Sequence, residues 1–432
     1  MKGWLLSGIF LLLILSGCPG SSVPEERVLR FWHFWSEPSH RAALLELIAE
    51  FERRFHCRVE LTELTWNEGK AKLLATFHAG TPPDVVELGS DWVAQFSSAG
   101  VLWAFPSDSI SLEHFVPFAH VPCYWNDTLY AVPWVVDTRV LFINRTALQR
   151  AGLPTEPPKT WEELFQVAQA LHNPPELYGC GVNGADPHRL YKKLLPLIWS
   201  LGGDVVDTTG APTLTHPSVV TAVEFYARLS RVGIVETQRQ LDDLFLRGKL
   251  GFWISGAWLA EKLRQQQPGW EYSTSLFPGW APGQPGIAFA GGEYLAISAA
   301  SSRKELALQL VRFLTAGEQA VRFCRKVPEA GFPADQRFHS DSLLLRIPYR
   351  RVFAQQLRYA RMTPVHPRWL DIEAALENAV VEALYGTHSP ATALQRAQAS
   401  LQQILKGPSA LNVLPQTPAS RAFPATAGDQ EP

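Results

Sequence analysis

The chain has 432 residues, more than one ordinary hydrophobic core supports, which indicates two domains or two lobes of one fold. Apolar residues make up 46% and charged residues 19%, a balance typical of a globular chain and not of a disordered one. The formal net charge is −2, so the sequence lacks the basic excess that nucleic-acid binding requires.

The N-terminus reads as an export signal. An uncharged, mostly apolar run over 4–16 is shorter than the roughly 20 residues that span a bilayer. It ends at Cys18 in the tetrapeptide LSGC, which resembles a bacterial lipobox. We therefore expect residues 1–17 to be a lipoprotein signal peptide, Cys18 to be acylated and to anchor the chain to the membrane, and 18–26 to be a tether. An ordinary signal peptide with a chance cysteine is the alternative.

The other four cysteines give no metal signature. Cys57, Cys123, Cys180 and Cys324 do not form a CxxC pair, which argues against a zinc site. An exported chain could oxidise two of them, but the spacing does not select a pair. The histidines do not cluster at metal-ligand spacing, so we expect neither a metal nor a cofactor.

The first part of the mature chain alternates strands and helices. Strands are predicted over 28–34, 59–61 and 84–88, and helices over 39–55 and 70–79. This β-α-β-α-β order predicts a parallel sheet with helices on its faces. Ligands of such sheets bind beyond the carboxyl ends of the strands. Those ends carry aromatic and acidic residues, namely Trp35 and Glu37 after the first strand, Trp66 after the second and Asp91 after the third.

Helices dominate the rest of the chain. Thr160 and Glu163 are predicted to form a reciprocal capping box, and Ser302 and Glu305 a second one. Helices are expected over 161–171, 191–201, 218–232 and 302–315, followed by a helix-rich stretch over 343–405. The tail over 408–432 is rich in proline and alanine without an apolar period, which predicts disorder.

An ordered series of short motifs runs through nearly the whole mature chain. They are PPDVV at 82–86, LYAVPW at 129–134, LFIN at 141–144, AGLP at 151–154, PPKTWEEL at 157–164, WSLGGD at 199–204, GK at 248–249, GAW at 256–258, GGEYLAIS at 291–298 and TP at 363–364. With the lipobox, the series resembles the extracellular solute-binding proteins of carbohydrate ABC importers, family 1, the maltose-binding-protein-like group, in its lipoprotein form. Side chains between the motifs differ from the maltose-binding protein, so its sugar is not carried over.

The resemblance implies an α/β fold of two lobes, the type II periplasmic-binding-protein fold, with the ligand in a cleft between lobes that several hinge crossings join. The crossings are expected near 135–138, 290–292 and 344–349. The implied N-terminal lobe combines 27–136 with 292–344, and the C-terminal lobe combines 137–291 with 345–407. A ligand that contacts both lobes would bias the hinge toward closure.

The expected ligand site follows from the chemistry of a sugar, which offers hydroxyls and flat C–H faces. Aromatic planes fit the faces, and carboxylates accept the hydroxyls. The sequence holds 15 tryptophans, and acidic and aromatic residues stand at the positions that match the family's ligand-facing segments. The candidates are Trp35, Glu37, Trp66, Asp91, Trp134, Asp137, Trp258, Glu293, Tyr294 and Trp369.

Three functions compete. The first is capture of a mono- or oligosaccharide, or a sugar-like osmolyte, by a non-enzymatic monomer held at the cell envelope (periplasm or outer face of the cytoplasmic membrane), for delivery to the permease subunits of an ABC importer. The second is capture of a charged solute (a metal, phosphate ester or polyamine) by the same fold, which would need clustered Arg and Lys, or several carboxylates without aromatic planes. The third is a glycoside hydrolase, but carboxylates on both sides of a hinge suit capture better.

Nucleotide and hydrolase motifs are absent from the sequence. The run GCGVNG at 179–184 satisfies G-x-G-x-x-G but neither follows a clear strand nor opens a helix, so it does not indicate a dinucleotide site. There is no P-loop, HExxH or GxSxG.

Overall fold

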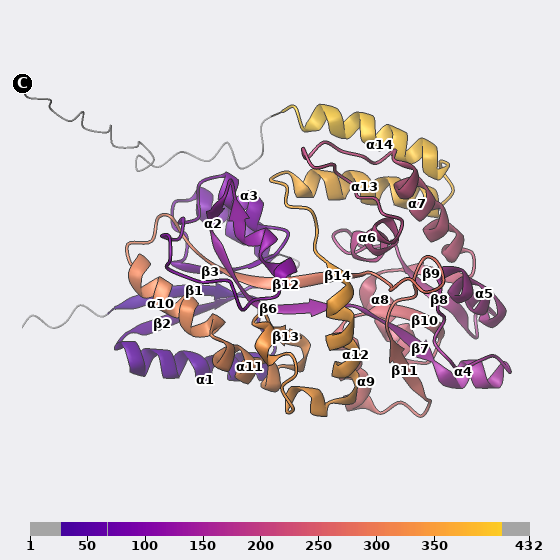
Figure 1. Ribbon diagram of the computed structural model, residues 1–432, viewed down its shortest axis with the longest axis horizontal. Coiled ribbons are helices and arrows are strands. Elements are labelled where there is room, and N and C mark those ends of the chain that lie inside the picture. The colour runs from indigo at the N-terminus through magenta and orange to yellow at the C-terminus, as the bar shows by residue number, and fades with distance from the viewer. Residues whose placement is uncertain (1–26, 67, 408–432) are drawn as a thin grey trace, which may run out of the picture.

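The computed structural model describes residues 27–66 and 68–407, which form a mixed α/β structure with two main sheets. Figure 1 shows the two sheets at opposite ends of the molecule, each with its own helices. The predicted signal peptide, Cys18, the tether over 18–26 and the tail over 408–432 lie outside the described residues.

The first sheet has the strand order β13-β6-β12-β3-β1-β2, with β14 paired to β12 at its end. Its strands are β1 (Val28–His33), β2 (Arg58–Glu63), β3 (Val85–Gly89), β6 (Ala131–Thr138), β12 (Ala288–Ile297), β13 (Phe332–Pro333) and β14 (Ala360–Arg361). Strands β1, β2 and β3 run parallel, which confirms the predicted β-α-β-α-β unit. Strands β12, β6 and β13 complete the sheet by antiparallel pairing.

Amphipathic helices cover this sheet. They are α1 (Pro38–Phe55), α2 (Gly69–His78), α3 (Val93–Ser98), α10 (Lys304–Thr315) and α11 (Gly317–Lys326). Helix α1 buries Leu44, Ile48 and Phe51 at helical spacing, as predicted, and packs against α10 and α11. It ends at His56, which takes the left-handed conformation with φ 49° and closes the last turn onto Glu52.

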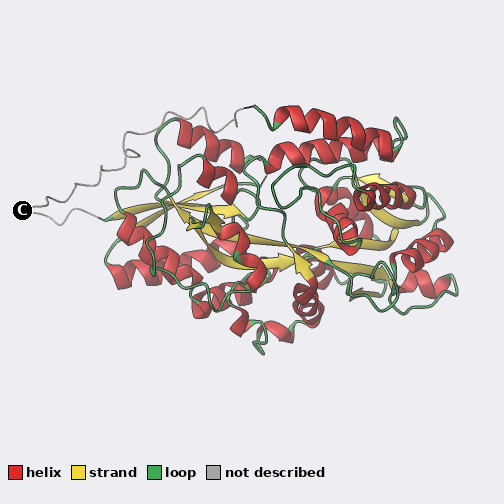
Figure 2. Cartoon of the chain, turned by 45° about the horizontal axis from the view of Figure 1, so that its top comes forward, coloured by secondary structure: helices red, strands yellow, loops and turns green. Residues whose placement is uncertain are grey.

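The second sheet has the order β11-β7-β10-β8-β9. Its strands are β7 (Val140–Asn144), β8 (Tyr178–Asn183), β9 (Gly233–Glu236), β10 (Leu250–Ser255) and β11 (Tyr272–Ser275). Its helices are α4 (Arg145–Arg150), α5 (Trp161–Leu171), α6 (Tyr191–Ser200), α7 (Pro217–Ser230), α8 (Gln238–Leu246), α9 (Ala257–Gln266), α13 (Trp369–Leu384) and α14 (Pro390–Ile404). Strands β10, β8 and β9 run parallel, and Figure 2 shows helices on both sides of the strands.

Two apolar cores support this arrangement. One fills the first lobe and continues into the second at α8 and α9. The other lies between the second sheet and helices α5, α6, α7, α13 and α14. The remaining elements are the hairpin β4 (Tyr124–Trp125) and β5 (Thr128–Leu129), helix α12 (Pro348–Gln356), and the 3-10 turns η1 (Pro117–Ala119), η2 (Val121–Cys123), η3 (Pro328–Ala330), η4 (Gln336–Phe338), η5 (Leu344–Arg346) and η6 (Leu357–Tyr359).

The chain passes from the first sheet to the second at one residue. Strand β6 ends at Thr138, Arg139 follows, and β7 begins at Val140. Beside this junction β12 runs antiparallel to β6, with Ala290 opposite Thr138. Helix α12 packs against both β6 and β7. The lobe boundaries and hinge positions implied by the resemblance stay predictions.

The helix caps only partly follow the sequence prediction. Thr160 Oγ1 accepts the N–H of Glu163 at 3.1 Å, but the Glu163 carboxylate bonds the N–H of Lys159 and not that of Thr160. The prediction for Ser302 and Glu305 is wrong, because α10 starts at Lys304 without a side-chain cap. A full capping box, not predicted, joins Thr237 and Gln240 at the start of α8.

Neither a membrane-spanning helix nor a metal cluster occurs among the described residues. None of the helices there combines the length and the apolar character that a bilayer crossing needs. Cys57, Cys123, Cys180 and Cys324 are all free thiols, and no three His, Cys, Asp or Glu side chains gather in a metal-binding arrangement within 27–66 and 68–407.

Candidate functional site

The carboxyl ends of parallel strands in the two sheets supply side chains that meet between the lobes. Asp91 follows β3 of the first sheet, and Tyr191 opens α6 of the second lobe. The Tyr191 hydroxyl donates to Asp91 Oδ2 over 3.4 Å, a direct contact between the lobes. We call the group Asp91, Asp137, Arg139, Tyr191, Trp258 and Glu293 the interlobe site.

An aromatic wall flanks Asp91 on the side of the first lobe. Trp66 is 42% exposed and stacks on Phe34 with 4.2 Å between ring centroids. Trp92 lies 5.5 Å from Trp66, and Lys70 Nζ lies 4.9 Å from the centroid of the Trp92 ring. The wall therefore offers both an open aromatic face and a cation.

The junction between the sheets supplies the floor of the site. Arg139 donates to the Asp137 carboxylate at 2.8 Å. Its guanidinium lies 5.1 Å from the Trp258 ring and 5.0 Å from the Phe289 ring, distances at which cation–π attraction is significant. A Cβ at Gly291 would lie 2.4 Å from Asp137 Oδ1, so glycine at that position leaves room for the ion pair.

Glu293 lies on β12 beside this floor. Burial raises the pKa of Glu293 well above its ordinary value, and the like charges of Asp137 and Glu87 raise it further. A raised pKa favours the protonated carboxyl group, which can donate one hydrogen bond and accept others. Such a group matches a hydroxyl, which also both donates and accepts.

A buried carboxylate fixes the tryptophan of the second lobe. Trp258 Nε1 donates to Asp242 Oδ2 at 2.9 Å, while Trp253 Nε1, Ser255 Oγ and Gln238 Nε2 donate to Oδ1 at 2.7, 2.8 and 2.9 Å. Because its N–H is already bonded, Trp258 has only its ring faces to offer a ligand.

Backbone geometry contributes to the same placement. A Cβ at Gly256 would lie 2.0 Å from Trp258 Cζ3, a distance that no real side chain tolerates. Glycine at 256 therefore lets the indole fold back over the start of α9, where Arg139 contacts it.

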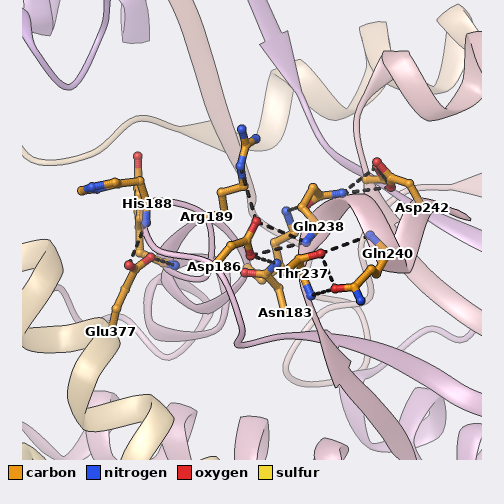
Figure 3. Close-up of polar contacts among 12 residues, drawn as sticks. Asn183, Asp186, His188, Arg189, Thr237, Gln238, Gln240, Asp242 and Glu377 are labelled. Atoms are coloured by element: carbon orange, nitrogen blue, oxygen red, sulfur yellow. Dashed lines mark hydrogen bonds and ion pairs between the residues drawn. The ribbon is translucent and has the colours of Figure 1, made fainter. Parts of the chain in front are cut away.

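A second polar group lies where β8 and β9 end, and Figure 3 shows it from Glu377 to Asp242. Asp186 accepts from Asn183 Nδ2 at 2.7 Å and from the Gln238 N–H at 3.3 Å, so it holds the start of α8. The Glu377 carboxylate accepts the N–H groups of His188 and Tyr191, at 2.8 and 3.1 Å. These bonds tie α13 to the start of α6 and fix the backbone that carries Tyr191.

His188 also bonds Glu373 on α13 through its ring. That hydrogen bond raises the pKa of His188 above its ordinary value. Burial and the neighbouring Glu373 charge raise the pKa of Glu377 to about 7. The Glu373 carboxylate thus favours the protonated form of His188.

Four predicted ligand residues lie together and four do not. Asp91, Asp137, Trp258 and Glu293 are in the interlobe site, with Trp66 on the adjoining wall. Trp134, Tyr294 and Trp369 are 0–1% exposed in the cores, and Glu37 is exposed at the N-cap of α1, so the structure does not bring these four to the site. Trp35 is nearly buried against Trp134 and Phe323.

Burial of Trp134 and Tyr294 has a direct cause. Trp134 stacks on Phe323 of α11 with 4.7 Å between ring centroids, so its ring fills the first core. The Tyr294 hydroxyl donates to the Ala119 carbonyl at 3.0 Å. Trp369 packs edge-on against Tyr191, 5.6 Å away, and so supports the interlobe site from behind.

The prediction missed the basic and supporting residues of the site, which are Lys70, Arg139, Tyr191, Lys192 and Asp242. A signal was available for one of them, Arg139, which stands two residues after the acidic Asp137 at the expected crossing. Nothing in the sequence singles out Lys70 or Lys192 among the other lysines.

Glu87 beneath this site makes stability depend on pH. Burial raises the pKa of Glu87 from 4.5 to about 8, so the folded chain holds a proton that the unfolded chain releases between these values. The free energy of unfolding must therefore fall as pH rises through that window, by up to about 1.4 kcal/mol per pH unit from this group. We expect Glu87→Gln to remove most of that slope in urea unfolding between pH 6 and 7.5. Exposed Glu60→Gln is the control, and parallel slopes for wild type and Glu87→Gln would contradict the assignment.

Comparison with known proteins finds relatives of this chain in sequence and in structure. Residues 35–321 match the family model described as bacterial extracellular solute-binding protein. A Brucella abortus binding protein is 25% identical over 79% of this chain and 84% of its own length. The galactooligosaccharide-binding protein of Bacillus subtilis is 22% identical over 84% and 86%. The solved structure of an ABC transporter solute-binding protein from Thermotoga lettingae, bound to α-D-tagatose, superposes with a TM-score of 0.77 at 22% identity, covering 88% of this chain and all of that one.

Proposed function

Because the chain belongs to the family of bacterial extracellular solute-binding proteins, with their two-lobed type II fold, we propose that it captures a sugar or sugar-like solute outside the cytoplasmic membrane. The captured solute is then delivered to the permease of an ABC importer. The chain acts by binding and release, without catalysis, and Cys18 anchors it to the membrane through a lipid.

The observation that carries the proposal is the meeting of acids and aromatic rings from both lobes. Asp91 follows β3 of the first sheet, Trp258 lies on α9 after β10 of the second, and Asp137 lies on β6 next to the junction between the sheets. A saccharide held there contacts both lobes, so its binding energy favours the closed arrangement over an open one. Closure is the event that a transporter can recognise.

Each side chain has a role that fits a saccharide. A free face of Trp258 or Trp66 suits the C–H face of a sugar ring, while Asp91 and Glu293 suit pairs of hydroxyls. The binding proteins named above support this class, since one is named for galactooligosaccharides and another holds α-D-tagatose.

The test is a thermal-shift panel on the exported chain, kept in detergent with its lipid. The panel contains monosaccharides and disaccharides, both neutral and acidic, together with amino acids, polyamines and divalent metals. A saccharide at about 100 times its Kd should stabilise the fold by about 2.7 kcal/mol and raise Tm by a few degrees. A shift with an amino acid, polyamine or metal and none with any saccharide would overturn the proposal.

A further inference from the structure

Three cations stand on aromatic rings around the interlobe site. Lys70 comes from α2 of the first lobe, Lys192 from α6 of the second, and Arg139 from the junction. Lys192 Nζ lies 5.5 Å from the Phe289 ring, and the Arg139 guanidinium lies 5.0 Å from the same ring. A ring that carries two cations marks a position where positive charge gathers.

Two of these cations lack a bonded acceptor among the described residues. Arg139 is paired with Asp137. Lys70 Nζ is buried and makes no hydrogen bond, and Lys192 Nζ contacts only the Tyr191 and Phe289 rings. A buried ammonium group without an acceptor is unfavourable, and the structure tolerates one at Lys70, while Lys192 is half-buried.

The acids around the two lysines balance only one of them. Asp91 attracts both ammonium groups, and its carboxylate bonds only the Tyr191 hydroxyl. Glu373 also attracts both, but it is bonded to His188. Burial raises the pKa of Glu293, which disfavours its charged form, and Asp137 is already bonded to Arg139. Among these acids, the two ammonium groups therefore share one carboxylate, Asp91, that no other cation bonds within the described residues.

The incomplete pairing of the two lysines is reflected in their lowered pKa values. Burial lowers the pKa of Lys70 to about 8 and also lowers the pKa of Lys192. A ligand that brought an anionic oxygen between them would stabilise both ammonium groups, because charge-assisted hydrogen bonds are stronger than neutral ones. Neutral hydroxyls would satisfy the hydrogen bonds but not the charge.

We infer that the solute is a saccharide bearing an acidic group, and that this group lies between Lys70 and Lys192 while the sugar ring lies against the aromatic faces. This inference rests on the proposed function and names its substrate class. The acidic group is an anionic oxygen cluster, either the carboxylate of a uronate or the phosphate of a sugar phosphate.

The test compares matched ligands by isothermal titration calorimetry on the exported chain. The pairs are galacturonate with galactose, glucuronate with glucose, and 1,4-linked digalacturonate with its neutral disaccharide; glucose 1-phosphate forms the phosphate arm. We expect one acidic member to bind at least about tenfold more tightly than its neutral partner, the ratio that one added charge-assisted hydrogen bond gives. The preference should weaken as salt rises.

Variants then locate the acidic group. Lys70→Met and Lys192→Met should each reduce the preference for the acidic member to less than about threefold. Lys72→Met is the matched control, since Lys72 lies on the same helix, exposed and paired with Glu68. Both site variants should fold, because methionine fits the space without needing an acceptor.

The outcomes separate the two proposals. Equal or tighter binding of the neutral member in every pair, or a preference that survives both substitutions, would overturn the inference and leave saccharide capture standing. A panel in which no saccharide binds at all, acidic or neutral, would overturn the proposed function as well.

Discussion

Replacing Asp242 by alanine is expected to lower the free energy of unfolding by about 3–5 kcal/mol, the loss typical of breaking a buried charged network. Asp242 is 3% exposed and accepts from four side chains, two of them indoles. Its removal leaves those donors unpaired and leaves the buried ammonium of Lys193 without its counter-charge. Urea unfolding followed by circular dichroism measures the change.

The neighbouring Asp243 provides the control. It lies on the same helix, is less buried, and its carboxylate has no hydrogen-bond partner within the described part of the chain. Asp243→Ala should therefore change the free energy of unfolding by less than about 0.5 kcal/mol. Equal effects at 242 and 243 would show that the network is not what stabilises this lobe.

Replacing Trp258 by alanine is expected to weaken binding of the saccharide by about tenfold to a hundredfold, the usual loss when a central aromatic contact is truncated. The ring is held in place by Asp242 and Gly256, so little entropy is lost when a ligand stacks on it. Calorimetry with the saccharide that gives the largest thermal shift is the measurement.

Two variants sharpen the result. Trp258→Phe loses the hydrogen bond to Asp242 but keeps an aromatic face, so it should retain most of the affinity that Trp258→Ala loses. Trp103→Ala removes a partly buried indole of the first lobe, which packs against Phe105 away from the site, and should leave the affinity unchanged. An affinity loss with Trp103→Ala equal to that with Trp258→Ala would indicate general destabilisation and would contradict a stacking role for Trp258.

Local patterns were enough to predict the first β-α-β-α-β unit and the helices from 161 to 232. Apolar spacing is a local property, and α5 begins and ends where its period does. The strand-end rule selected Asp91, and the structure places this residue in contact with Tyr191 of the other lobe. That rule works because the ends of parallel strands share one edge of a sheet, whatever the details of packing.

Which face of a strand a side chain takes could not be predicted in the same way. Glu293 and Tyr294 are neighbours on β12, so one points to the site and the other into the core. Choosing between them requires the pairing of β12 with β3 and β6, which contact it from distant parts of the chain. Trp134 was misplaced for the same reason.

The cations were missed for a different reason. The sequence favoured a sugar over a charged solute because aromatic residues follow the first strands while clustered Arg and Lys are not visible. Lys70 and Lys192 are 122 positions apart, and both approach Asp91 only because α2 and α6 belong to lobes that face each other. The gathering of charge in a site is a property of the assembled lobes and cannot be predicted from one stretch of sequence.

The antiparallel pairing of β6 with β12 has a mechanical consequence. A ribbon of two bonded strands bends more easily across its flat side than it shears along its length, so we expect it to be the pivot about which the lobes open. Arg139 follows β6 directly and should then move little on opening, whereas the bond between Asp91 and Tyr191 should break. On this hypothesis groups near the ribbon contact the solute first, and the groups farther from it hold the solute after closure.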